Sequence, residues 1–233
     1  MYKDLKIKPP FFEVGPKAFL YGEKMLKLAQ VIDKTAMKYD LDVIVTPQYT
    51  DIKLLADNTE RILVFAQHMD YLTPGRGLGS VLPEAVKAAG AVGVMLNHAE
   101  KPLTLEEIEK TIARADEVGL GTIVCADTVE DVKKIAKMGP NLIVAEPTDL
   151  IGTGQTSDSN YVIETIKTVN EINPDIMVLQ GAGISNGQDV YNTIKLGAQA
   201  TGTTSGIMKS DRPYEMVEEM LYNLRKAWDE LHA

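Results

Sequence analysis

The segment from residue 142 to residue 154 reads Leu-Ile-Val-Ala-Glu-Pro-Thr-Asp-Leu-Ile-Gly-Thr-Gly. Its first four residues are apolar and are typical of a parallel strand that is buried on both faces. Glu146 follows this run directly, Pro147 restricts the backbone where a loop departs, and Gly152 and Gly154 can take positive φ at its far end. We interpret the segment as a carboxylate at a strand end, followed by a loop suited to closing over it and excluding water.

Runs of this kind recur along the chain. Apolar and often β-branched residues occupy Phe11–Val14, Val43–Thr46, Ile62–Ala66, Val92–Leu96, Thr122–Ala126, Leu142–Ala145, Ile176–Leu179 and Ala200–Gly202. Amphipathic stretches with helical spacing separate the runs, among them Glu23–Tyr39, Leu105–Val118 and Asp189–Leu196. Eight alternating units in 233 residues predict an α/β fold, a closed parallel (β/α)8 barrel rather than an open doubly wound sheet.

Several helix ends are marked in the sequence. Thr104 with Glu107 forms a capping box, and Thr128 precedes a first turn that contains two acidic residues. Gly119 and Gly139 mark the ends of the corresponding helices. The chain has no Gly/Ser/Pro-rich linker and no low-complexity segment, so we expect one domain that spans residues 1–233.

Composition narrows the function classes. The net charge is −9 and the lysines are scattered among acids, so no basic stripe is available for nucleic acid or an anionic membrane. No apolar run reaches membrane-spanning length, and the charged start of the chain is unlike a signal peptide. Cys125 is the only cysteine, which excludes an intramolecular disulfide and favours a reducing cytoplasm. No cluster has metal-ligand spacing, and we expect neither metal nor cofactor.

Polar or glycine-rich segments follow several of the expected strands. They are Gly15-Pro16-Lys17, Gln67-His68, Asn97-His98-Ala99-Glu100, Gly181-Ala182-Gly183 and Thr203-Thr204-Ser205-Gly206. Because a barrel gathers the carboxyl ends of its strands at one mouth, we expect these segments to lie together with Glu146.

The motifs resemble those of the triosephosphate isomerase family in its short, archaeal-type branch. The matching segments are Phe65–His68, Pro74-Gly75, Gly79–Glu84, Leu96–Glu100, Ala145–Gly154 and Gly181–Ser185, and they occur in family order. The resemblance implies a TIM barrel that isomerises a small phosphorylated sugar without a cofactor. The simplest such reaction interconverts glyceraldehyde 3-phosphate and dihydroxyacetone phosphate.

The resemblance also implies roles for single residues. Glu146 is the base that moves a proton between adjacent carbons, and His98 is the electrophile. In this family the histidine is a neutral imidazole whose pKa is lowered by a helix N-terminus, and the family is the standard example of that effect. Lys17 supplies positive charge beside the substrate, and Glu100 organises Lys17. The phosphate is held by backbone N–H groups of the loops after the last three strands. The residues that match this phosphate-binding site are Ile151, Gly152, Gly183, Thr204 and Ser205.

Two positions depart from the family pattern. Gly15 stands where the family has the asparagine of an Asn-x-Lys element, and Ala99 stands where most members have a serine. Gly15 therefore removes an amide from the substrate-binding position, or leaves room for a substrate that is one carbon longer. The alternatives are a tetrulose (erythrulose) phosphate isomerase and a catalytically silent phosphometabolite-binding protein. The complete set of Lys17, His98 and Glu146 argues against the silent alternative.

The remaining candidates have more ordinary interpretations. His68 is expected at an interface or behind the site, Cys125 as a packed thiol and His232 at a frayed terminus. The segment Met69–Leu78 resembles the loop with which one subunit docks beside the active site of another. We therefore expect a homodimer or a homotetramer.

Overall fold

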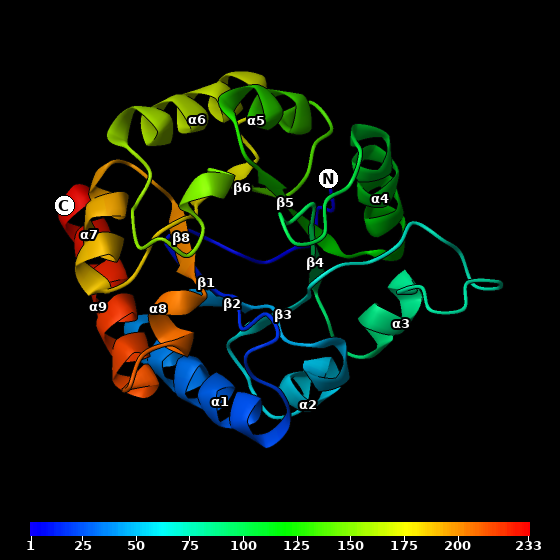
Figure 1. Cartoon of the computed structure of the whole chain (residues 1–233), viewed down its shortest axis with the longest axis horizontal. Coiled ribbons are helices and arrows are strands. Elements are labelled where there is room, and N and C mark those ends of the chain that lie inside the picture. Colours follow the sequence, from blue (N-terminus) through cyan, green and yellow to red (C-terminus); the bar gives the residue numbers. More distant parts are fainter.

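The computed structural model describes residues 1–233, and its eight strands form a closed barrel (Figure 1). Each strand pairs in parallel with its sequence neighbours, and β8 closes the barrel on β1. The strands are β1 (Phe11–Val14), β2 (Asp42–Val45), β3 (Leu63–Ala66), β4 (Gly93–Leu96), β5 (Gly121–Ala126), β6 (Leu142–Ala145), β7 (Met177–Gln180) and β8 (Ala200–Thr203). The fold is the expected (β/α)8 TIM barrel.

Helices surround the barrel on all sides (Figure 1). They are α1 (Gly22–Tyr39), α2 (Ile52–Ala56), α3 (Pro83–Ala88), α4 (Leu105–Val118), α5 (Val129–Ala136), α6 (Ser159–Ile172), α7 (Gly187–Lys195), α8 (Ser205–Met208) and α9 (Pro213–Leu231). Two short 3-10 turns, η1 (Tyr49–Asp51) and η2 (Thr148–Leu150), lie in loops after strands. None of the helices combines the length and the apolar character that a membrane crossing requires.

The helix ends agree with the sequence analysis in most details. The capping box is formed, since Thr104 Oγ1 accepts from Glu107 N at 3.2 Å while Glu107 Oε2 accepts from Thr104 N at 2.8 Å. Gly119 ends α4 with a φ of 77°. Gly139 also has positive φ, but it lies beyond the cap of α5, which is Lys137.

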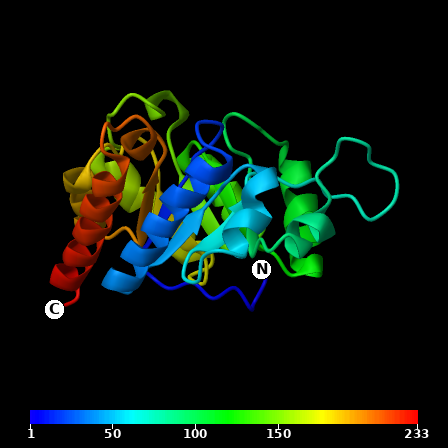
Figure 2. The same cartoon turned by 90° about the horizontal axis from the view of Figure 1, so that it is seen from below.

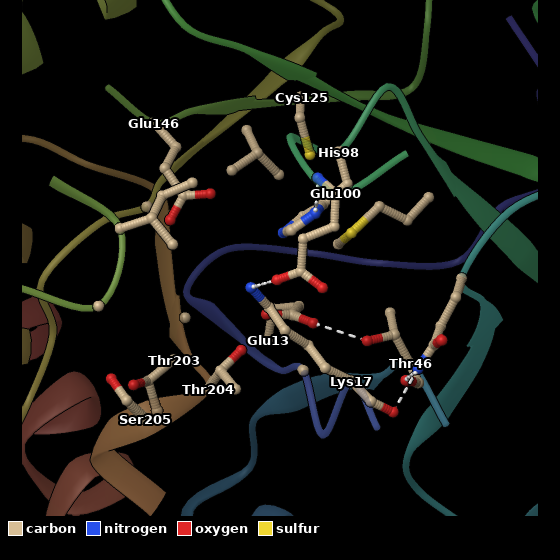
Figure 3. A pocket seen from close by; sticks show the side chains of 18 of the residues that line it. Glu13, Lys17, Thr46, His98, Glu100, Cys125, Glu146, Thr203, Thr204 and Ser205 are labelled. Carbon is tan, nitrogen blue, oxygen red and sulfur yellow. Dashed lines mark hydrogen bonds and ion pairs between the residues drawn. The ribbon is translucent and has the colours of Figure 1, made fainter. Parts of the chain in front are cut away.

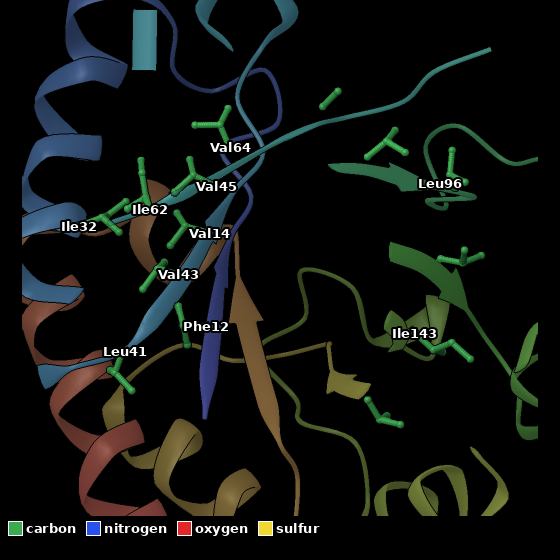
Figure 4. Close-up of a cluster of buried hydrophobic side chains, with 14 of the residues drawn as sticks. Phe12, Val14, Ile32, Leu41, Val43, Val45, Ile62, Val64, Leu96 and Ile143 are labelled. Carbon is green, nitrogen blue, oxygen red and sulfur yellow. The ribbon is translucent and has the colours of Figure 1, made fainter. Parts of the chain in front are cut away.

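Alternation along the strands divides the core into two layers. Phe12 and Val14 of β1 face outward into a large cluster between the barrel and the helices (Figure 4). Phe11 faces inward and joins a smaller cluster that fills the barrel, with Phe65 and Leu142 among its members. Since successive side chains of a strand point to opposite faces, residue 13 also points into the barrel.

The loops after the strands all open on one side of the barrel, away from both termini (Figure 2). The loop between β3 and α3 extends sideways from the body of the molecule, and its Leu78 is fully exposed (Figures 1 and 2). The barrel thus gathers the polar strand ends at one mouth, as expected.

Candidate active site

A cavity of about 400 Å³ opens at the mouth of the barrel, within the size range of small-molecule sites. All ten residues singled out from the sequence line it. They are Gly15, Lys17, His98, Glu100, Glu146, Ile151, Gly152, Gly183, Thr204 and Ser205. The barrel therefore brings together residues that follow five strands, β1, β4, β6, β7 and β8, which are far apart in the chain.

Lys17 is held in a fixed and strained conformation (Figure 3). Its φ of 47° is unusual for a residue with a side chain. Two amides fix its carbonyl oxygen, because Gln48 Nε2 donates to it at 2.7 Å and Gln67 Nε2 at 3.0 Å. Its Nζ pairs with Glu100 Oε1 at 2.6 Å. Lys17 and Glu100 thus interact as the family pattern implies, and Gln48 is a supporting residue that the sequence analysis missed.

His98 has a defined tautomer. The backbone N–H of Glu100 donates to His98 Nδ1 at 3.0 Å, so the proton of the neutral ring lies on Nε2. Burial lowers the pKa of His98 and the charge of Lys17 lowers it further, against an opposing effect of Glu100. His98 is therefore neutral at pH 7.

The cause of this neutrality differs from the expectation of a helix N-terminus. The N–H that contacts His98 belongs to a turn, and α4 begins only at Leu105. Asn97 holds this turn with a φ of 56°: its Nδ2 donates to the Cys125 carbonyl at 2.9 Å, and its Oδ1 accepts from Leu103 N at 2.9 Å.

Glu146 directly follows β6 and lies mostly buried in the cavity wall (Figure 3). Burial raises the pKa of its carboxyl, which a hydrogen bond from Ala182 N at 2.9 Å partly offsets. The backbone after β7 passes close to this side chain, since a Cβ atom at Gly181 would lie 2.9 Å from Glu146 Cβ. A carboxylate in such surroundings is a stronger base than one in water.

The loop after Glu146 rests on the loop after β7. Gly183 has a φ of 70°, and a Cβ atom there would lie 2.0 Å from the Gln155 carbonyl oxygen. The N–H groups of Gly152, Gly183 and Thr204 donate to no protein acceptor, and Ser205 is the first residue of α8. Unpaired N–H groups around one cavity are suited to binding an anion.

Glu13 is the main site residue that the sequence analysis missed. It points into the cavity from β1, is 8% exposed, and accepts a hydrogen bond from Thr46 Oγ1 at 3.0 Å (Figure 3). Burial raises the pKa of its carboxyl to about 8, against the opposing effect of Thr46. The available signal was an acid inside the apolar run Phe11–Val14, at the inward-facing register.

Glu13 also changes the interpretation of Gly15. A Cβ atom at Gly15 would lie 3.0 Å from Glu13 Oε1 and 3.2 Å from Thr204 Oγ1. The space expected beside Gly15 is therefore bordered by the carboxyl group of Glu13 and the hydroxyl of Thr204.

Three other residues considered in the sequence analysis, Cys125, His68 and His232, are held by packing or hydrogen bonds within the protein. Cys125 is buried, and burial together with nearby carboxylates keeps the pKa of its thiol well above the ordinary value. His68 is buried at the edge of the cavity, with Nε2 3.3 Å from Asp70 Oδ1. His232 is not frayed, since its ring stacks on Trp228 with 3.9 Å between centroids. No three His, Cys, Asp or Glu side chains are grouped to hold a metal ion.

Comparison with known proteins gives one consistent result. The family model described as "Triosephosphate isomerase" matches residues 17–220. The chain is 39% identical over 227 residues to the triosephosphate isomerase of Sulfurisphaera tokodaii, covering 96% of this chain and 99% of the relative. It is 36% identical over 203 residues to the triosephosphate isomerase of Methanocaldococcus jannaschii, covering 86% of this chain and 92% of the relative.

Proposed function

This chain belongs to the triosephosphate isomerase family, and on that premise we propose that it interconverts glyceraldehyde 3-phosphate and dihydroxyacetone phosphate without a cofactor. One observation on this chain gives the proposal its main support. A buried carboxylate, a neutral imidazole and a lysine ammonium, those of Glu146, His98 and Lys17, face the same cavity.

The reaction needs a base and a source of electrophilic help. Glu146 removes a proton from the carbon next to the substrate carbonyl, and the carbonyl oxygen gains negative charge as the enediolate forms. His98 donates from Nε2–H to that oxygen, and Lys17 lowers the energy of the developing charge. Glu146 then returns the proton to the neighbouring carbon, while the proton of the adjacent hydroxyl passes through the His98 imidazole to the former carbonyl oxygen. Atoms and charge balance, so neither a metal nor a redox cofactor enters the steps.

The phosphate of the substrate occupies the other side of the cavity. The N–H groups of Gly152, Gly183, Thr204 and Ser205 supply donors there, with Ile151 contributing to the wall. Backbone donors suit a site that must hold an anion in one position, because they lose little freedom on binding. The substrate carbons are thereby placed between Glu146 and His98.

The loop after Glu146 closes over the bound substrate in this proposal. Pro147 begins the loop and Gly152 and Gly154 have φ values of 74° and 77° near its end. Thr148 N donates to Asp127 Oδ1 at 2.7 Å and anchors the loop beside the barrel. Exclusion of water strengthens the electrostatic help of Lys17 and protects the enediolate intermediate.

We further propose a homodimer or homotetramer in the cytoplasm. The loop Met69–Leu78 supports the assembly, because it projects from the barrel with Leu78 fully exposed and Tyr71 half exposed. A long loop with exposed apolar residues is typical of a contact surface. Light scattering on the purified protein gives the assembly state, and a strict monomer would contradict this part of the proposal.

A coupled isomerase assay tests the proposed reaction. We expect triose phosphate turnover with kcat/KM of about 10⁶ M⁻¹s⁻¹ or more, within the usual range for enzymes. The same assay with erythrulose phosphate is the comparison. A preference for erythrulose phosphate of tenfold or more would replace triose phosphate as the substrate, and binding of both sugars without turnover would leave a silent binding protein.

A further inference from the structure

Glu13 occupies a slot that two glycines create. A Cβ atom at Gly202 of β8 would lie 2.9 Å from Glu13 Oε2, and one at Gly15 would lie 3.0 Å from Glu13 Oε1. Side chains at either position would displace the carboxyl group. The slot is lined by neighbouring strands on both sides and opens to the cavity, which Glu13 itself lines. The position of the Glu13 carboxyl group is therefore fixed by the strands of the barrel rather than by a flexible loop.

The two oxygens of Glu13 differ in their surroundings. Oε1 accepts from Thr46 Oγ1 at 3.0 Å, whereas Oε2 receives no hydrogen bond from the protein and is not sealed from the cavity. Glu13 forms no ion pair, and the ammonium of Lys17 is bonded to Glu100 instead. Oε2 is thus the atom of Glu13 that is free to contact a bound substrate.

The protonation state of Glu13 follows from burial and from its charged neighbours. Burial raises its pKa to about 8, Glu146 acts in the same direction, and Lys17 and Thr46 oppose it. Cys125 also faces this part of the barrel, but as an uncharged thiol. At pH 7 the group is mostly a neutral acid. Since Oε1 accepts from Thr46, the proton lies on Oε2, where it forms a donor without a protein acceptor.

We propose that Glu13 donates a hydrogen bond from Oε2 to the substrate oxygen on which negative charge develops, at the place where residue 15 has no side chain to offer one. The inference rests on the proposed isomerase reaction and adds a substrate-contacting residue to it. The proton stays on Glu13 before and after the reaction, so the overall balance is unchanged. A preorganised neutral donor of this kind acts mainly on the transition state, and removing one lowers kcat by roughly 10²-fold to 10³-fold.

Two variants test the assignment. Glu13→Ala removes the donor and should lower kcat by roughly 100-fold to 1,000-fold with a much smaller change in KM. Glu13→Gln keeps a donor that cannot ionise. It should keep kcat at pH 7 within about tenfold of the parent, a loss below about 1.4 kcal/mol.

The pH profile separates a substrate contact from a packing role. In the parent, kcat/KM should fall as pH rises through about 8, because Glu13 ionises and loses its proton. In Glu13→Gln that alkaline decline should disappear. Asp33→Asn is the matched control, since Asp33 is a buried acid outside the cavity that accepts from Glu60, Arg61 and Ile62 N–H groups. Its profile should follow that of the parent.

Several results would overturn the assignment. They are an alkaline decline that persists in Glu13→Gln, a loss beyond tenfold in that variant at pH 7, or near-parental activity of Glu13→Ala. Carbon-13 NMR of the carboxyl groups, without substrate, must also show a group that titrates near pH 8 and is absent from Glu13→Gln. A parent that titrates there but turns over no sugar phosphate would refute the proposed function while leaving the protonation state of Glu13 intact.

Discussion

Two carboxyl groups, those of Glu13 and Glu146, share one cavity in which burial raises the pKa of both. The groups that donate hydrogen bonds to these two carboxyl groups differ. Glu146 accepts a backbone N–H from Ala182, which favours its charged form, while Glu13 accepts only the hydroxyl of Thr46. Environments that move the pKa values of two such groups apart permit one to act as a base while the other remains a neutral acid. This division of roles is the residue-scale feature that distinguishes the site.

Burial of Glu13 should reduce stability at high pH. Because its pKa rises from 4.5 to about 8 on folding, the folded state binds more protons than the unfolded state between these values. The free energy of unfolding must therefore fall as pH rises through this window, by on the order of 5 kcal/mol at most. Glu13→Gln removes the effect.

Denaturant titrations of the parent and Glu13→Gln at pH 5 and pH 8 check this prediction. The variant should gain stability relative to the parent on going from pH 5 to pH 8. A difference that does not change with pH would show that Glu13 is not held in its neutral form by folding.

The sequence predicted the residues that lie in loops after strands and missed the one inside a strand. Glu146 and His98 follow apolar runs, so their positions at the mouth of a barrel could be expected from the strand pattern alone. Glu13 sits within the run Phe11–Val14, where the apolar neighbours outweighed the acid. Its role depends on Gly15 and Gly202 lying beside it, and Gly202 comes from the far end of the chain.

At the scale of elements, strand positions were predictable because all eight strands are short apolar runs with polar or glycine-rich ends. Each observed strand begins and ends within one residue of its expected range. Three short helices, α2, α3 and α8, were not predicted, because four to six residues do not display a helical period. The contact between the loop after Glu146, which is the proposed lid, and the loop after β7 could not be predicted, since it joins Gly183 to Gln155 through backbone atoms.

Gly183→Ala should disturb the lid. A Cβ atom at this position would lie 2.0 Å from the Gln155 carbonyl oxygen, so the loop after Glu146 must move away. Displacement of a positioning element by about 1 Å can lower the rate about 100-fold. Steady-state kinetics should show this loss in kcat/KM.

Gly197→Ala is the control for the loop substitution. Gly197 also has positive φ, 96°, but no atom lies within 4 Å of an added Cβ. It therefore carries the same kind of backbone strain without the contact. Equal kinetic losses in the two variants would mean that strain, rather than the position of the lid, explains the effect.

At the scale of the whole molecule, the barrel joins both ends of the chain. β8 pairs with β1, and α9 packs on α1 and α7 (Figure 1). We propose that the 233 residues form one cooperative domain, because no part of the closed sheet can leave without breaking the barrel.

One unfolding transition should therefore be seen by all probes. Trp228 is the only tryptophan and lies in α9, so its fluorescence follows the C-terminal helix, while far-UV circular dichroism follows the whole chain. Denaturant curves from the two signals should coincide when recorded at the same protein concentration, which holds the assembly state constant. A fluorescence transition that clearly precedes the other would indicate an independently unfolding C-terminal part.

The proposed reaction requires Glu146 to move a proton between two carbons of a bound sugar phosphate. The most direct measurement is incorporation of solvent deuterium into the carbon-bound positions of dihydroxyacetone phosphate, followed by NMR with the parent and Glu146→Gln. The parent should incorporate deuterium as it turns over. The variant fills the same space without a base and should be slower by roughly 10²-fold to 10⁴-fold, while binding of a phosphate analogue remains. Retention of more than about a tenth of the parental exchange, a loss under about 1.4 kcal/mol, would contradict the account.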